Sequence, residues 1–201
     1  IQCNHRMMVS HDACAGRLDG NPIREDIEEA GRILGIDFIV NVVLDAHKEI
    51  IKCVSGDPVK AHREGCAFLD RLYKCPIPEK ADIVVVSAGG FPKDMNMYQA
   101  QKALDNAKHA VRDGHEKSSD IIDHLHKHFV LGGHKAAAIA LVLQKAKIVL
   151  VSAYDDDYVR SVHLTPAASA DEAMRNALSE YGSDAKVILM PIGGSTLPSL
   201  A

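Results

Sequence analysis

The chain has 201 residues, of which 47% are hydrophobic and only 4% aromatic, with no tryptophan. This length suits one large or two small domains, whose cores must rest on aliphatic side chains. The 27 acidic and 23 basic residues give a formal net charge of −4, which argues against a nucleic-acid partner because duplex binding needs a basic surface. No apolar run approaches the ~20 residues of a membrane-spanning helix, so we expect no membrane partner.

The cysteines indicate a reducing compartment. None of the five forms a Cys-x-x-Cys pair, so neither a zinc ribbon nor a thioredoxin-like motif is supported, and no secretory signal peptide precedes them. We therefore expect free thiols in the cytoplasm. The chain starts with Ile1 instead of methionine, and we read it as a piece of a larger protein. The cysteines are Cys3, Cys14, Cys53, Cys66 and Cys75.

The first half of the chain predicts a helix, a hairpin and a second helix after an irregular polar start. Asn21 and Pro22 have the side chains preferred for an N-cap and a first helical position, and Gly35 suits a C-cap. β-Branched and apolar residues then predict strands, which a short polar turn joins into a hairpin. In chain order we expect a helix from 21 to 35, strands over 38–44 and 50–54, and a helix over 58–73.

Two prolines within three residues, Pro76 and Pro78, predict a stiff extended break and a domain boundary. Residues 1–76 would be the C-terminal portion of an N-terminal, cofactor-binding domain, and residues 79–201 a C-terminal domain that contributes substrate contacts. Strands and helices alternate after the break, which predicts an α/β fold with a mixed or parallel sheet flanked by helices. We expect strands over 83–87, 148–152 and 187–190, and helices ending near 113 and spanning 120–128, 132–145 and 169–181.

The segment 86–107 is the strongest candidate for a binding site. It is predicted to be a strand, a double-glycine turn and a helix, on which Gln99, Lys102 and Asn106 share a polar face. Open α/β sheets bind ligands at the carboxyl ends of their strands, where lysine can hold a carboxylate and glutamine a hydroxyl or carbonyl. From the residues alone, a ligand site and a solvated helix face are equally supported. The separate apolar stripe is Ala100, Ala103, Leu104, Ala107 and Val111.

Histidines and glycine turns offer further candidates. His5 lies in a polar segment and is either a ligand for a borderline metal, nickel included, or a hydrogen-bonded loop residue. His62 is expected to be a packing or capping residue of its helix. His134 follows Gly132-Gly133, and this turn and Gly193-Gly194 could each present N–H groups to an anion. We interpret both as tight turns or close packing sites.

Several long segments, in sequence order, resemble the nickel-pincer lactate racemases and related 2-hydroxyacid racemases. The central one is SAGGFPKDMNMYQAQKALDNA. The resemblance covers nearly the whole chain. The other matching segments are NHRMM, LDGNPIREDIEEA, FIVNVVLD, SGDPVKAHREG, FVLGGHKAAAIA and MPIGGSTLP.

The resemblance implies a C-terminal part of a 2-hydroxyacid racemase or epimerase that uses a nickel-pincer nucleotide as its cofactor. His5 corresponds to the nickel ligand, and Gln99 and Lys102 correspond to substrate contacts. The implied reaction removes the Cα hydride from the hydroxyacid and returns it through a planar 2-keto acid. Its partners would be the small 2-hydroxyacid and the cofactor-synthesis proteins.

This chain departs from the family pattern at three points. The tethering lysine and the proton-transfer histidines correspond to positions before Ile1, so we expect no catalytic residue within this chain and no activity from it alone. After Gly114 the usual apolar strand and glycine-rich loop are absent, either deleted or unrecorded. Because the chain has no tryptophan, any aromatic wall around the substrate must differ from that of relatives that use one. Two alternatives stay open: a non-catalytic α/β module that binds a small anion at its glycine turns, and a family member that acts on a sugar acid or larger hydroxyacid.

Overall fold

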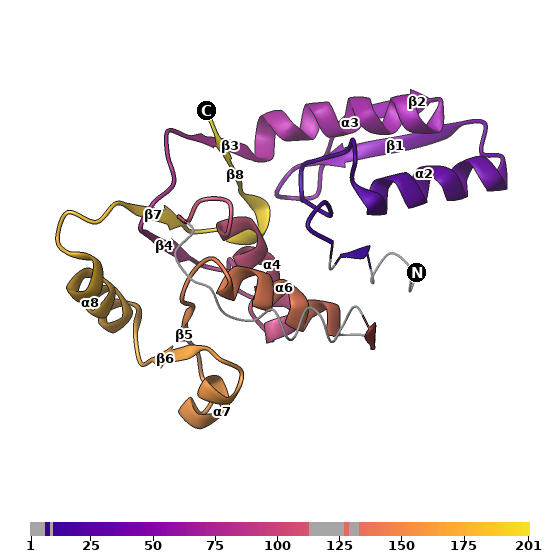
Figure 1. Cartoon of the computed structure of the whole chain (residues 1–201). Helices are drawn as coiled ribbons and strands as arrows, with labels where there is room; N and C mark the ends of the chain where they lie inside the picture. Colours follow the sequence, from indigo (N-terminus) through magenta and orange to yellow (C-terminus); the bar gives the residue numbers. More distant parts are fainter. Residues whose placement is uncertain (1–6, 9, 113–126, 129–132) are drawn as a thin grey trace. The chain divides into compact units, whose positions relative to one another are not determined.

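The computed structural model describes residues 7, 8, 10–112, 127, 128 and 133–201, and the chain forms two compact units, Ile1–Cys75 and Pro76–Ala201 (Figure 1). The division falls at Pro76, the first proline of the expected break. The roles expected for the two parts, cofactor binding and substrate contact, stay predictions. His5 lies outside the described residues.

The first unit pairs a β-hairpin with two helices, as the sequence predicts. Helix α2 (Pro22–Leu34) begins where the Asn21 side chain accepts a hydrogen bond from the backbone of Ile23, and it ends at Gly35 with a φ of 73°. Helix α3 packs against the hairpin. The hairpin strands are β1 (Ile39–Leu44) and β2 (Ile50–Gly56), which run antiparallel, and α3 is Pro58–Tyr73.

The core of the first unit is thin. Its buried hydrophobic side chains among the described residues are Val43, Val54 and Ala61. Larger aliphatic side chains stay on its surface: Ile33 is 82% exposed and Leu34 is 77% exposed. Polar contacts therefore contribute much of what joins its helices.

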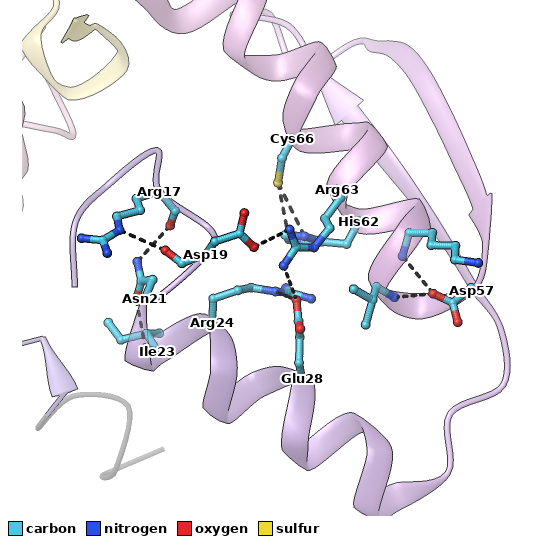
Figure 2. A network of polar contacts seen from close by, with 12 residues as sticks. Arg17, Asp19, Asn21, Ile23, Arg24, Glu28, Asp57, His62, Arg63 and Cys66 are labelled. Carbon is cyan, nitrogen blue, oxygen red and sulfur yellow. Dashed lines mark hydrogen bonds and ion pairs between the residues drawn. The ribbon is translucent and has the colours of Figure 1, made fainter. Parts of the chain in front are cut away.

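Ion pairs join α2 to α3 in this unit (Figure 2). Arg24 donates to Glu28 at 2.7 Å, and Arg63 on α3 reaches Glu28 at 3.6 Å and Asp19 at 2.7 Å. The hydrogen bond from Arg24 holds the pKa of the Glu28 carboxyl below its usual value, and Arg63 adds to this. The Arg24–Glu28 pair is largely shielded from water, with side-chain exposures of 13% each, so it is screened less than a surface pair.

The second unit is α/β, as predicted, but its strands pair in twos. Strands β4 and β7 run parallel, with Ile83 opposite Val187 and Val86 opposite Met190. Strands β5 and β6 also run parallel, and β3, whose residues Pro76 and Ile77 belong to this unit, pairs with β8. In chain order the elements are β3 (Lys74–Ile77), β4 (Ile83–Val86), α4 (Met97–Ala107), α6 (Gly133–Leu143), β5 (Val149–Val151), α7 (Asp156–Ser161), β6 (Thr165–Ala167), α8 (Ala170–Tyr181), β7 (Val187–Met190), η1 (Gly193–Ser195) and β8 (Leu197–Leu200).

Two aliphatic clusters make the core of the second unit, which accords with its lack of tryptophan. One gathers α4 with the parallel pair β4–β7, and the other gathers α6, β5 and α7. Small side chains let α4 approach the strands closely, since Ala107 and Ala110 are 6% and 0% exposed. The buried members are Ile77, Ala107, Ala110 and Met190 in the first cluster, and Val142, Ile148, Val159 and Leu164 in the second.

One predicted helix end is wrong. Helix α4 stops at Ala107 instead of near residue 113, and Val111 forms a parallel β-bridge with Ala81. The backbone of Ala81 donates to Ala110 and accepts from Arg112, so extended pairing replaces the last helical turns. The predicted helix over 120–128 falls almost wholly outside the described residues.

Two composition-based expectations have structural counterparts. Cys53, Cys66 and Cys75 are free thiols, as predicted, while Cys3 is outside the described residues. Within the described ranges, no helix is both long enough and apolar enough to cross a membrane.

Candidate functional site

The candidate site lies at the carboxyl ends of the parallel strands β4 and β7. The loop after β4 turns at Gly89 and Gly90, whose φ values of 94° and 77° favour glycine. The loop after β7 folds into η1 beside it, where Gly193 donates to the Ser87 carbonyl at 2.8 Å. Lys93 in the first loop donates to Ser195 in the second at 3.4 Å. The two loops thus support each other where α/β folds bind ligands.

Helix α4 starts from this edge and carries the predicted polar residues. The Asn96 side chain caps the helix by accepting from the backbone of Gln99 at 3.0 Å. One turn on, Lys102 donates from its Nζ to Gln99 Oε1 at 2.8 Å. Gln99 is half-buried and Lys102 is exposed. The structure therefore brings the two predicted substrate contacts together.

No described acidic side chain neutralises the charge of Lys102. Within the part of the chain that the structure describes, no carboxylate forms an ion pair with it, and its partner Gln99 is a neutral amide. The amide nitrogen of Gln99 stays available as a donor once Oε1 accepts from Lys102. The pair can thus offer an ammonium and an amide N–H, which together fit a carboxylate and a neighbouring oxygen.

Asn106, the third member of the predicted polar face, has a structural role. Its Nδ2 donates to the Gly193 carbonyl at 2.8 Å, so it ties α4 to η1. The Gly193 backbone lies against the helix: a Cβ on this residue would be 3.0 Å from the Cβ of Ala103. The interpretation of Gly193-Gly194 as a close packing site is therefore correct for Gly193.

Helices α4 and α6 contact each other (Figure 1). A second group of polar side chains lies between them, and of its members sequence reasoning had singled out only His134. Gln101 is only 2% exposed and accepts from Lys135 Nζ at 3.0 Å. The same ammonium lies 4.9 Å from the centre of the Tyr98 ring. His134 is 2% exposed and meets Tyr98 edge-on at 6.0 Å. The available signal was a single charged residue, Lys135, near the start of an otherwise apolar helix.

A metal centre has no counterpart within the described ranges. No group of three or more His, Cys, Asp or Glu side chains there could hold a metal ion. The predicted nickel ligand His5 falls outside these ranges. The described residues do not by themselves fit a nickel-pincer group.

His62, expected to pack or cap, lies half-buried along α3, with its ring nitrogens 3.6 and 3.7 Å from the Cys66 sulfur (Figure 2). Burial lowers the pKa of His62 and raises that of the Cys66 thiol. Both groups therefore favour their neutral forms, which suits packing more than catalysis.

Comparison with known proteins connects this arrangement to a family. The chain is 29% identical over 98% of its length to a lactate racemase of Thermoanaerobacterium thermosaccharolyticum, and 31% identical over 96% to a lactate racemase of Lactiplantibacillus plantarum. It covers 54% and 53% of these proteins, so it spans about half the length of the curated relatives it matches.

Solved structures agree. The lactate racemase apoprotein from T. thermosaccharolyticum matches 99% of this chain and 55% of its own, with a TM-score of 0.87 and 28% identity. A protein from Thermotoga maritima matches 90% of this chain with a TM-score of 0.60, and at 16% identity it shows the fold alone.

The departure after Gly114 also has a counterpart. The alignments with the two relatives run over 231 and 226 residues, more than the 201 of this chain, so both contain residues with no counterpart here. The family model described as "Lactate racemase C-terminal domain" matches in two segments, residues 77–124 and 116–197, which overlap just after this point. With that match over more than half of its length, the chain belongs to the lactate racemase family.

Proposed function

We propose that this chain is the C-terminal part of a nickel-pincer-dependent isomerase that racemises or epimerises a 2-hydroxyacid, and that Lys102 and Gln99 bind the substrate. One observation carries the proposal for these residues: the 2.8 Å contact between them at the carboxyl edge of β4 and β7, with no described carboxylate on Lys102. Family membership supports the reaction class.

Inversion at Cα explains why such a pair is useful. The hydrogen must leave one face of Cα and return to the other, through a planar 2-keto acid. The 2-keto acid has to stay bound by its carboxylate meanwhile, because its release would end the cycle before the hydrogen returns. The Lys102 ammonium holds the carboxylate, and the Gln99 amide donates to the oxygen on Cα, which becomes the carbonyl.

Hydride acceptance at Cα is the chemistry that the nickel-pincer nucleotide supplies in this family. The described residues lack a metal-binding group, so we assign to them substrate binding and not cofactor binding. His5 stays the predicted nickel ligand.

The glycine-turn alternative, a non-catalytic anion-binding module, loses the Gly193 donor of its Gly193-Gly194 turn. An anion would need free backbone N–H groups at these turns. Gly193 already donates to the Ser87 carbonyl, and Gly89 to Ser87 Oγ at 3.1 Å.

Substitution of Lys102 tests the clamp in the full-length, cofactor-loaded enzyme that contains this chain. Lys102→Ala should lower kcat/KM by a factor that corresponds to a loss of at least ~2 kcal/mol of transition-state stabilisation. The reason is that it removes a charge-assisted contact to the carboxylate. Lys147→Ala is the matched control, since Lys147 pairs with Glu180 at 3.0 Å away from the site. An unchanged kcat/KM in Lys102→Ala would show that the clamp is misassigned.

Metal analysis tests the assignment of His5 independently of activity. His5→Ala should lower the nickel content of the loaded protein, measured by plasma emission, because one ligand is lost. His47→Ala is the control, since His47 is an exposed turn residue of the hairpin. Full nickel retention in His5→Ala would exclude His5 as a necessary ligand.

A further inference from the structure

A second ammonium lies beside the predicted carboxylate clamp. Tyr98 and Lys102 are four residues apart on α4 and therefore share a face, with Cβ atoms about 5–6 Å apart. The Lys135 ammonium from α6 lies over the Tyr98 ring at 4.9 Å and donates to Gln101 at 3.0 Å. Lys135 thus extends toward the same side of α4 as Lys102.

The position of Lys135 is fixed by its surroundings. A surface lysine normally extends its ammonium into water, but Lys135 is half-buried and has two specific partners. Gln101, which accepts from it, is 2% exposed and so has little freedom to move. The ammonium is therefore held in place before any ligand arrives.

The described residues do not balance the positive charges of Lys102 and Lys135. Both contacts of Lys135 are with neutral groups, an amide and an aromatic ring. The nearest acidic influence, Asp105, already pairs with Lys108 at 2.6 Å. Burial lowers the pKa of Lys135, and the Lys102 charge lowers it further, while Asp105 acts in the opposite direction. A ligand with two negative charges would relieve this repulsion more than a ligand with one.

We propose that Lys135 is a second cationic group of the Lys102 site, and that the site takes a 2-hydroxyacid whose side chain carries another anionic group, a carboxylate or a phosphate. This inference rests on the proposed function, because it assumes that Lys102 holds the carboxylate next to Cα. It adds a substrate class: Lys135 selects the charge at the far end of the molecule.

The test is a ligand titration of the 201-residue chain, labelled with ¹³C at the lysine Cε and observed by NMR. Lys102→Arg and Lys135→Arg assign the two signals. The ligands are malate, malamate and 3-phosphoglycerate. Malamate is the malate analogue in which a neutral amide replaces the distal carboxylate. Malamate should shift only Lys102. Malate or 3-phosphoglycerate should shift the signals of both lysines and bind about fivefold more tightly than malamate. The tighter of these two identifies the distal group.

Lys135→Met supplies the discriminating variant. It should reduce the preference for the doubly charged ligand over malamate to less than about twofold, while Lys135→Arg keeps most of it. A purely structural role for Lys135 would change both affinities together and leave their ratio intact.

The failures of the two proposals differ. Suppose that every ligand shifts the Lys102 signal, that the Lys135 signal never shifts, and that malate and malamate bind equally tightly. The inference about Lys135 is then overturned, while the assignment of Lys102 to the carboxylate stands. If no ligand shifts Lys102, both proposals fall.

Discussion

Substitution of Gly193 by alanine would place a methyl group against atoms from two elements that support the site. The added Cβ would lie 2.2 Å from Val86 Cγ2, 3.0 Å from Ala103 Cβ and 3.2 Å from the Ser87 carbonyl oxygen. Ordinary contacts between carbon atoms are at about 3.5–4.0 Å. The η1 backbone would have to move away by about 1 Å, and the Asn106 hydrogen bond to Gly193 would stretch with it.

The magnitude follows from overpacking combined with a weakened hydrogen bond. Overpacking in a core costs about 1–3 kcal/mol, and a net hydrogen bond contributes about 1 kcal/mol. We expect Gly193→Ala to lower the free energy of unfolding by about 3 kcal/mol. At an m-value of about 1–3 kcal/mol/M, the urea midpoint should fall by about 1–3 M.

Tyrosine fluorescence during urea unfolding measures this change selectively. Four of the five tyrosines, Tyr98, Tyr154, Tyr158 and Tyr181, belong to the second unit. Far-UV circular dichroism on the same samples detects whether the first unit unfolds separately.

Gly194→Ala is the matched control, because the nearest atom to its added Cβ is the Ala88 carbonyl oxygen at 3.8 Å, an ordinary contact. It should change stability by less than about 0.5 kcal/mol. Adding Val86→Ala to Gly193→Ala should recover part of the loss, because it removes the closest clashing atom. Equal midpoints for Gly193→Ala and Gly194→Ala would refute the packing argument.

Two further predictions concern Asn106 and His62. Asn106→Ala should lower the stability of the second unit by about 1 kcal/mol, because the Gly193 carbonyl loses its shorter hydrogen bond and keeps only the 3.4 Å bond from the Thr196 backbone; an unchanged urea midpoint would contradict this role. Burial, aided by Arg24 and Arg63, holds the pKa of His62 below its usual value. Stability from His62 is therefore complete above about pH 6.5 and declines as pH falls through the lowered pKa, because the unfolded chain binds the proton more readily. Thermal melts at pH 7.5 and 5.5 should show a smaller acid-induced loss in His62→Gln than in the unsubstituted chain, and equal losses would refute the assignment.

Local patterns predict much of this fold. Helix α3 spans Pro58–Tyr73, the range expected from the sequence, and α2 is capped by Asn21 and Gly35 as their side chains indicate. The hairpin also follows from its apolar segments and polar turn. These features depend on residues within one or two turns of each other, so the sequence contains the information directly.

Pairing between distant segments is where the prediction fails. The end of α4 is set by Ala81, which draws residues 110–112 into extended pairing although their neighbours suit a helix. Likewise β3 and β8, separated by most of the second unit, were not predicted as partners. Backbone pairing across such distances leaves no periodic signal in either segment.

The site divides in the same way. Helical spacing predicts that Gln99 and Lys102 meet, because they lie three residues apart, and they do. The same spacing suggested that Asn106 joins them, but its partner, Gly193, comes from the other end of the unit. Lys135 reaches Gln101 across 34 positions of the chain, so its proximity depends on how α6 packs against α4.

Helix α4 also has a consequence for protein engineering. Ala103, Ala107 and Asn106 anchor it through burial and the bond to Gly193. Among the described residues, the side chains of Gln99 and Lys102 hydrogen-bond only to each other. Positions 99 and 102 can therefore be randomised in a library with little loss of folded protein, while positions 103, 106 and 107 stay fixed. New ligand preferences can be selected on this helix without first redesigning its support.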